Sequence, residues 1–327
     1  MVMRSGSMGM LKRGLLVGLQ TTWSLAKIIF PITLIVTILG HTPVLGWIAH
    51  LLAPFLGVIG LPGEAAIPLV VGNFLNLYAG IGAILSLELT VKEVFILALM
   101  LSFSHNLIIE SAVAKKVGLR VSVVLAVRIG LALVAAFLVN IFWQGGQETA
   151  QYGFIGTSDS AAAEPVTGWF AIAWSGIESA LYGSLQLALI VIPLMMVIQI
   201  MREKNWLRLI AKAMSPFTRL LGIRENTSTT LASGLTIGLA YGAGVMTQAV
   251  KEDGVKKKDL YLVFIFLVAC HAVVEDTVVF IPLGIPVLPL LIIRLVTAIV
   301  LTMIIAFVWK RIEQKRTHQG KEATYEH

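Results

Sequence analysis

Two stretches of this apolar chain each place a histidine and at least one acid a few residues apart. Residues 103–111 read FSHNLIIES, and residues 269–277 read ACHAVVEDT. An ionised side chain at the centre of a bilayer costs about 2.5–3.5 kcal/mol on insertion scales, so such groups usually face a cavity or a partner. Histidine changes its charge near neutral pH, and with carboxylates it can bind a proton, a cation or a hydrogen-bonding solute. The candidate binding residues in these stretches are His105, Asn106, Glu110, Ser111, His271, Glu275, Asp276 and Thr277.

Two arginines and several helix-breaking residues follow the acids. Arg128 and Arg294 lie in the last apolar segment of each half of the chain. Each could pair with the acid of its own half, or bind a carboxylate or phosphate group of a solute. Glycine and proline disfavour helix interiors, and they follow the acids at Gly118, Pro282 and Gly284. We therefore expect helices broken just after the acids, with helix ends and polar side chains meeting at the centre of the molecule.

Glycine-rich apolar segments precede both stretches. They read GNFLNLYAGIGAILS at residues 72–86 and GLTIGLAYGAGVMTQ at residues 234–248. Glycine permits a tight turn, close contact between helices, and bare backbone groups that a ligand can reach. Tight helix packing alone would also explain these glycines. The candidate binding residues in the two segments are Gly80, Gly82, Gly242, Gly244, Asn73 and Asn76.

The composition places the elements that carry these residues in a membrane. Of 327 residues, 57% are hydrophobic and 13% are charged, whereas a soluble domain carries about 25% charged residues. Several apolar runs approach the roughly 20 residues with which a helix crosses a bilayer. We predict an all-α polytopic membrane protein. Lysine and arginine lie mostly between the apolar runs, so the net charge of +7 does not indicate nucleic acid as a partner.

The elements occur twice along the chain, as an internal repeat. A shift of 162 residues aligns Pro31 with Pro193, Gly72 with Gly234, Gly80 with Gly242 and Gly82 with Gly244. After a four-residue insertion at 251–254, a shift of 166 residues aligns His105 with His271, Glu110 with Asp276 and Arg128 with Arg294. Random apolar sequence does not match such residues in order, so we infer a duplication.

The repeat divides the chain into four parts. We expect a first repeat at 10–144, an extracytoplasmic linker at 145–167, a second repeat at 168–312 and a cytoplasmic tail at 313–327. Each repeat is predicted to contain three full spans, a re-entrant hairpin and an interfacial helix. The hairpins are expected at 62–90 and 225–250, the interfacial helices at 43–58 and 204–221, and the spans with histidine and acid at 91–113 and 259–280.

The basic residues predict that the two repeats are inverted in the membrane. The segment 202–224 is strongly basic, whereas its counterpart, 41–63, contains no Lys or Arg. Cytoplasmic loops carry the excess of Lys and Arg, so equivalent loops that differ this sharply lie on opposite sides. With the linker outside, both termini lie in the cytoplasm, and the glycine-rich segments enter and leave on one side as hairpins. As ordinary spans, the alternative, they would place the basic segment 250–259 outside.

Enzymatic chemistry is not predicted. The sequence contains no Gly-x-Ser-x-Gly, His-Glu-x-x-His or Walker motif. Its single cysteine, Cys270, excludes an internal disulfide. Cys270, His271, Glu275, His105 and Glu110 are plausible transition-metal ligands, but their spacing matches no compact metal site, so metal binding is left open.

The quoted motifs resemble a known family. GIGA…HNLIIESAVAKKVG and GAGV…CHAVVEDTVVFIPLGIP look like the nucleoside-recognition, or Gate, domain family, which includes spore maturation protein-like membrane proteins and the gate segments of ferrous iron transporters. The order of elements also resembles the core of concentrative nucleoside transporters, and the likeness covers nearly the whole chain as two copies. It implies that hairpin tips and broken helices bind a solute and a coupling ion. Carried over, this indicates Asn106, Glu110, Glu275 and Asp276 with the glycine-rich tips.

Together, these observations predict a secondary transporter in the cytoplasmic membrane. It would move a small polar solute, nucleoside-like or a small organic anion, by alternating access. No cofactor is expected beyond a coupling cation or proton, and the expected partners are the solute and the lipid bilayer, with a homodimer left open. The alternatives are a transition-metal ion permease and a non-transporting membrane partner in a complex.

Overall fold

The fold is helical throughout the part of the chain that the structure describes. The computed structural model describes residues 7–153, 168–204, 218–224, 227–239 and 255–325, with four single positions between 204 and 218. Within these residues the β structure is limited to one isolated antiparallel bridge between Thr90 and Thr149. The prediction of an all-α protein is confirmed.

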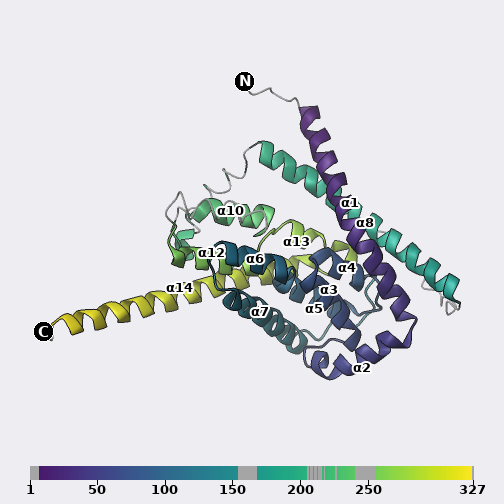
Figure 1. Ribbon diagram of the computed structural model, residues 1–327, viewed down its shortest axis with the longest axis horizontal. Helices are drawn as coiled ribbons and strands as arrows, with labels where there is room; N and C mark the ends of the chain where they lie inside the picture. Colours follow the sequence, from purple (N-terminus) through teal and green to yellow (C-terminus); the bar gives the residue numbers. More distant parts are fainter. Residues whose placement is uncertain are drawn as a thin grey trace.

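Two long helices, α1 (Ser7–Gly40) and α8 (Trp169–Glu203), cross beside the rest of the molecule (Figure 1). Each continues through its proline without a break in the helix. They are antiparallel: Gly14 and Gly18 pack on the backbones of Met196 and Ile192, while Gly176 packs on Leu34 near the other end. Small residues four positions apart let two helix backbones approach closely in a membrane.

The first half continues with shorter elements. They are α2 (Pro43–Gly57), η1 (Gly63–Ala65), α3 (Ala66–Phe74), α4 (Leu77–Ile84), α5 (Val91–Ser104), α6 (Leu107–Lys116) and α7 (Val121–Phe142). The described elements of the second half after α8 are α10 (Ser228–Ile237), α12 (Lys257–Ala269), α13 (Glu275–Val278), η3 (Ile281–Leu283) and α14 (Val287–Tyr325). Helices α5 and α12 form the centre, since every residue of α5 from Val94 to Ser104 is buried.

Helices α3 and α4 form a close hairpin. They are separated by two residues, and a Cβ added to Gly80 would lie 3.1 Å from the Cα of Gly72. Both ends of the hairpin lie beside Asn140 of α7: Gly60 packs on its side chain, and Lys92 Nζ donates to its carbonyl oxygen at 3.0 Å. The segment 61–90 therefore begins and ends at the same end of α7.

The segment that follows α7, here called the strap (residues 143–153), joins the two halves. Val91 N donates to Glu148 O at 2.9 Å, and Tyr152 Oη donates to Leu87 O at 2.9 Å. At the far end of the strap, Gly153 N donates to Pro282 O of η3 at 2.7 Å. The start of the predicted linker is thus fixed against both halves.

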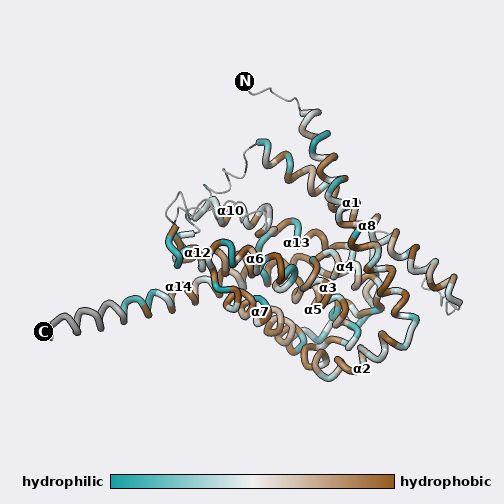
Figure 2. Tube along the Cα trace, in the orientation of Figure 1, coloured by the Kyte–Doolittle hydropathy of each residue, from teal (hydrophilic) through white to brown (hydrophobic). Residues whose placement is uncertain are grey.

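Within the described part of the chain, five helical segments are long and apolar enough to cross a membrane. They are Gly9–Gly40, Val91–Lys116, Val121–Phe142, Trp169–Met201 and Val287–Gln314. The sixth predicted span, 259–280, is wrong as a continuous helix, because α12 ends at Ala269 and α13 begins at Glu275. The apolar colour continues along the long helices, and hydrophilic residues gather toward the C-terminal end of α14 (Figure 2). Half of the second predicted interfacial helix, 204–221, and half of the second predicted hairpin, 225–250, lie outside the described residues.

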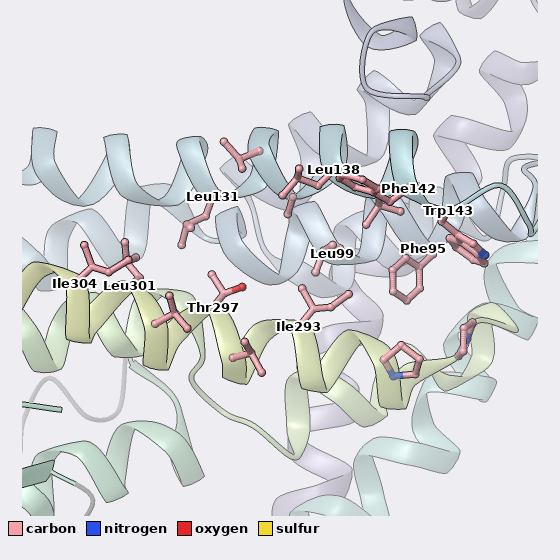
Figure 3. A pocket seen from close by; sticks show the side chains of 17 residues that line it. Phe95, Leu99, Leu131, Leu138, Phe142, Trp143, Ile293, Thr297, Leu301 and Ile304 are labelled. Atoms are coloured by element: carbon pink, nitrogen blue, oxygen red, sulfur yellow. The ribbon is translucent and has the colours of Figure 1, made fainter. Parts of the chain in front are cut away.

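Helices α7 and α14 run antiparallel and border an apolar groove of about 870 Å³ (Figure 3). Along α7 the labelled residues run from Leu131 to Phe142, while those on α14 run in the opposite sense, from Ile304 to Ile293. Thr297 is the one hydroxyl among the described lining side chains. The groove is separate from the polar stretches of the sequence.

Candidate binding site at the two helix breaks

Both His–acid segments are broken helices, but the breaks come before the acids. Helix α5 ends at Ser104, Asn106 takes a left-handed conformation with φ 55°, and α6 begins at Leu107. In the second half Ala272 has φ 41°, between the end of α12 and the start of α13. Helix ends also follow the acids, as expected: α6 ends at Lys116 and α13 at Val278, and Gly118 and Gly284 have positive φ. The breaks that precede the acids were not predicted.

A neighbouring helix end supports each break. Asn106 N donates to Gly72 O near the end of α3 at 3.1 Å, and Ala272 N donates to Gly234 O near the end of α10 at 3.0 Å. These contacts supply acceptors for backbone N–H groups that a continuous helix would have satisfied internally. Gly72 aligns with Gly234 and Asn106 with Ala272 in the repeat, so the contact occurs twice.

The two arginines bind the carbonyls that the breaks expose. Arg128 Nε donates to Phe103 O at 2.8 Å and Nη2 to His105 O at 2.6 Å, while Nη1 pairs with Glu110 Oε2. In the second half Arg294 Nη2 donates to His271 O and Asp276 Oδ2, each at 3.0 Å. Both arginines are fully buried. Of the two roles that the sequence left open for the arginines, the structure has pairing with the acid of the same half, and Arg294 Nε is buried without a partner among the described groups.

The histidines bring the two halves together. The ring centroids of His105 and His271 lie 5.2 Å apart. Glu110 Oε1 of the first half lies 3.3 Å from His271 Nε2 of the second half and 3.7 Å from His105 Nε2. His271 Nε2 also lies 3.6 Å from Asp276 Oδ2. We call His105, Glu110, His271, Asp276 and the two arginines the central cluster.

Three further predicted residues surround the central cluster. Thr277 accepts from Arg294 Nη1 at 3.4 Å. Glu275 is partly buried and accepts a hydrogen bond of 2.5 Å from Tyr78 Oη of α4. Ser111 is partly exposed on α6, next to Glu110. Tyr78 was not predicted; the only sequence signal was its place beside the glycines of the apolar hairpin.

The asparagines of the first hairpin divide into two roles. Asn76 caps α4, because its side-chain oxygen accepts from Ala79 N at 2.9 Å. The Oδ1 atoms of Asn73 and Asn106 are buried without a hydrogen-bond partner among the described residues. Buried polar atoms are normally hydrogen-bonded, and an orphaned acceptor is a place for a ligand or a water. That Asn73 and Asn106 bind a solute stays a prediction.

The predicted glycines of the hairpin serve helix packing. Gly80 packs on Gly72 and Leu101, and Gly82 packs on Ile29 and Thr33 of α1. The turn of the hairpin falls at residues 75–76 instead, so the expectation that Gly80 and Gly82 form its tip is wrong. Their counterparts Gly242 and Gly244 lie outside the described residues.

Metal binding fits the central cluster poorly. One donor atom each of His105, Glu110 and His271 lie within 4.8 Å of one another. However, Arg128 holds the other oxygen of Glu110, and Arg294 holds Asp276. These two carboxylates are already paired with fixed guanidinium groups, so a divalent cation here would lie close to two buried positive charges.

Comparison with known proteins links the chain to one family model and one close relative. The model described as "Gate: Nucleoside recognition" matches residues 22–120 and 184–286. A protein of Bacillus subtilis (strain 168), described as an uncharacterized membrane protein YvoD, is 62% identical over 310 residues, which cover 95% of this chain and 97% of the relative. No solved structure matches. The two matched segments contain both helix breaks and all four acids and histidines of the central cluster.

Proposed function

Because the chain belongs to the nucleoside-recognition (Gate) family, whose model matches both halves, we propose that it is a secondary transporter of a small polar solute. The observation that carries the proposal is the central cluster, where two broken helices from opposite halves meet. Discontinuous helices from two repeats form the solute and ion sites of many secondary transporters. Transport would occur by movement of one half against the other around this cluster.

An inverted arrangement of the halves supports alternating access. The equivalent helices α1 and α8 are antiparallel, as are α7 and α14. A two-fold axis in the membrane plane relates such helices in opposite directions. The first hairpin begins and ends at the Asn140 end of α7 and reaches the helix break with Gly72, as a re-entrant hairpin would.

Helix α2 supports the proposed interfacial position. Trp47, Leu51 and Phe55 lie four residues apart on one face, and each is more than half exposed. A helix with an exposed apolar stripe of this kind lies along the membrane surface with that stripe toward the acyl chains. The first repeat then contains all the predicted kinds of element.

The cluster favours a neutral, hydrogen-bonding solute over an organic anion. Arg128 and Arg294 are buried and each is already paired with a carboxylate of its own half, so their positive charges are balanced within the protein. The orphaned oxygens of Asn73 and Asn106 can accept hydrogen bonds from a solute. A nucleoside, with several N–H and O–H donors, fits this chemistry.

Uptake by proteoliposomes tests the proposal, with labelled uridine and adenosine as probes under an imposed pH gradient. We expect Glu110→Gln and Asp276→Asn each to reduce uptake at least about tenfold, because removing one member of a buried ion pair costs several kcal/mol. Glu203→Gln is the matched control. Glu203 Oε2 lies 2.6 Å from Arg13 Nη2, and this ion pair is not part of the central cluster. Unchanged uptake in both cluster variants would contradict the site.

The alternative of a non-transporting partner predicts a different result. Wild-type protein in liposomes would then take up neither probe, and a second membrane protein would co-purify with it in stable proportion. The metal alternative predicts instead that metal accumulation in cells falls when the protein is deleted.

A further inference from the structure

The hydrogen bonds of the two central histidines show that Nδ1 of each ring carries a hydrogen. His105 Nδ1 lies 2.7 Å from Leu101 O, and His271 Nδ1 lies 2.7 Å from Leu267 O. A carbonyl oxygen can only accept, so each Nδ1 carries a hydrogen. A neutral ring then presents a bare lone pair at Nε2, whereas an imidazolium presents an N–H there.

The Nε2 atom of His271 faces two acidic oxygens. It lies 3.3 Å from Glu110 Oε1 and 3.6 Å from Asp276 Oδ2. Glu110 is paired with Arg128, and Asp276 is paired with Arg294. A bare lone pair on Nε2 would repel both anionic oxygens, whereas an N–H would donate to them, and a charge-assisted bond is about twice as strong as a neutral one. His105 Nε2 faces one such oxygen only, at 3.7 Å.

The charges near the two histidines are balanced when one of the two rings carries an additional proton. Among the described residues, the ionisable groups that contact the histidines, adjoin them or their partners in sequence, or pair with such groups are Tyr78, Glu110, Arg128, Cys270, Glu275, Asp276 and Arg294. Two of them are permanent cations and three are carboxylates, so one imidazolium brings their sum to zero. A second imidazolium would be 5.2 Å from the first, between ring centroids, and like charges this close disfavour each other.

We infer that the central cluster is a proton-binding site, in which one proton resides on Nε2 of His271 and is donated to Oε1 of Glu110. The proton joins the lone pair of Nε2 from solvent water and leaves by the same bond, so the ring alternates between the neutral and charged forms. Since Glu110 belongs to the first half and His271 to the second, the proton connects the two halves. Its role as the coupling proton rests on the proposed transport function; its presence on His271 does not.

Nitrogen NMR of the full-length protein in lipid nanodiscs tests the inference. Histidine labelled with the NMR-active nitrogen isotope reports whether each ring nitrogen carries a hydrogen, and His105→Gln and His271→Gln assign the two central signals among the six histidines. At neutral pH we expect His271 to show two protonated nitrogens and His105 to show a protonated Nδ1 with a bare Nε2. A bare Nε2 on His271 in the wild-type protein would overturn the inference.

A variant and its control sharpen this test. Glu110→Gln removes the negative acceptor, so the extra proton on His271 should be lost at the same pH, while Glu203→Gln should leave the central signals unchanged. A doubly protonated His271 in Glu110→Gln would contradict the assigned acceptor. The wild-type spectrum decides the main point even if Glu110→Gln does not fold, and the uptake assay is independent of both.

Discussion

At the scale of single residues, Arg128 and Arg294 each make three hydrogen bonds but use different donor atoms, although they are equivalent in the repeat. Arg128 uses Nε, Nη1 and Nη2, whereas Arg294 Nε is buried with no partner among the described groups. Lysine cannot reproduce the fork of a guanidinium. We expect Arg128→Lys to reduce the free energy of unfolding by about 1.5–3 kcal/mol more than Arg294→Lys, the value of one hydrogen bond to a charged group.

Thermal unfolding of the two purified variants in the same detergent measures this difference. The comparison controls for the lost guanidinium in general, because both variants keep a positive charge in a fully buried position. Equal shifts in the two midpoints would mean that the bond from Arg128 to Phe103 O contributes nothing measurable.

The sequence predicted the residue types of the cluster and the pairing within each half. Histidine, acid and arginine recur in order at a constant spacing, and each buried acid needs a cation. The contact between Glu110 and His271 joins the halves and has no counterpart in the repeat, so only the fold reveals it. Tyr78 was missed for the same reason, since it lies in α4 and its partner lies in α13.

At the scale of elements, the strap packs against Gly284. The equivalent glycine of the first half, Gly118, has no such neighbour. Gly284 has φ +68°, and an added Cβ would overlap Gln151 O of the strap. Gly118, its equivalent, has φ +82°, but a Cβ there would meet nothing within 4 Å. Both alanine variants bear the left-handed backbone penalty of about 1–2 kcal/mol, so we expect Gly284→Ala to be clearly the less stable of the two.

Thermal unfolding and limited proteolysis of the strap measure this effect. Displacement of the strap should also increase cleavage within residues 143–153 in Gly284→Ala and leave cleavage in Gly118→Ala at the wild-type level. Identical stability and cleavage in the two variants would show that the strap adjusts without cost.

The elements themselves were predicted with uneven success. Apolar runs and basic flanks located α1, α7, α8 and α14, because length and composition decide whether a helix crosses a bilayer. The breaks before the acids were not predicted, since Ala272 is a helix former by type and Asn106 is a single asparagine within an apolar run. The breaks arise from tertiary contacts, namely the backbone bonds from α3 and α10 and the guanidinium groups that bind the freed carbonyls.

At the scale of the whole molecule, several basic segments meet at one end. Arg120 N donates to Tyr261 Oη at 3.0 Å, and Lys258 pairs with Glu313 at 2.7 Å, so the segments around residues 120, 258 and 313 are in contact. The strap contacts η3 instead, through Gly153 and Pro282. Cytoplasmic loops carry the excess of Lys and Arg. This grouping supports the proposed topology, in which the strap is outside and the C-terminal end of α14 is in the cytoplasm.

Cysteine labelling of intact cells checks that topology. In a Cys270→Ala background, we expect Gln147→Cys in the strap to react with a membrane-impermeant maleimide from outside. Gln314→Cys on α14 should react only after the membrane is permeabilised. Both positions are exposed, and Cys270→Ala alone is the unreactive control. Reaction of the two positions in the reverse order would refute the proposed orientation.

The two arginine–carboxylate pairs have an electrical consequence for such a transporter. In the proposed inverted arrangement, an axis in the membrane plane relates the pair in one half to the pair in the other, so their dipoles along the membrane normal oppose each other. The membrane voltage then exerts almost no net force on the permanent charges of the pairs. A proton on His271 adds one elementary charge, worth about 2.3 kcal/mol for each 100 mV that it crosses. Voltage would therefore act mainly on the proton-free cluster, which carries one net negative charge, and leave the neutral, proton-loaded cluster nearly unaffected.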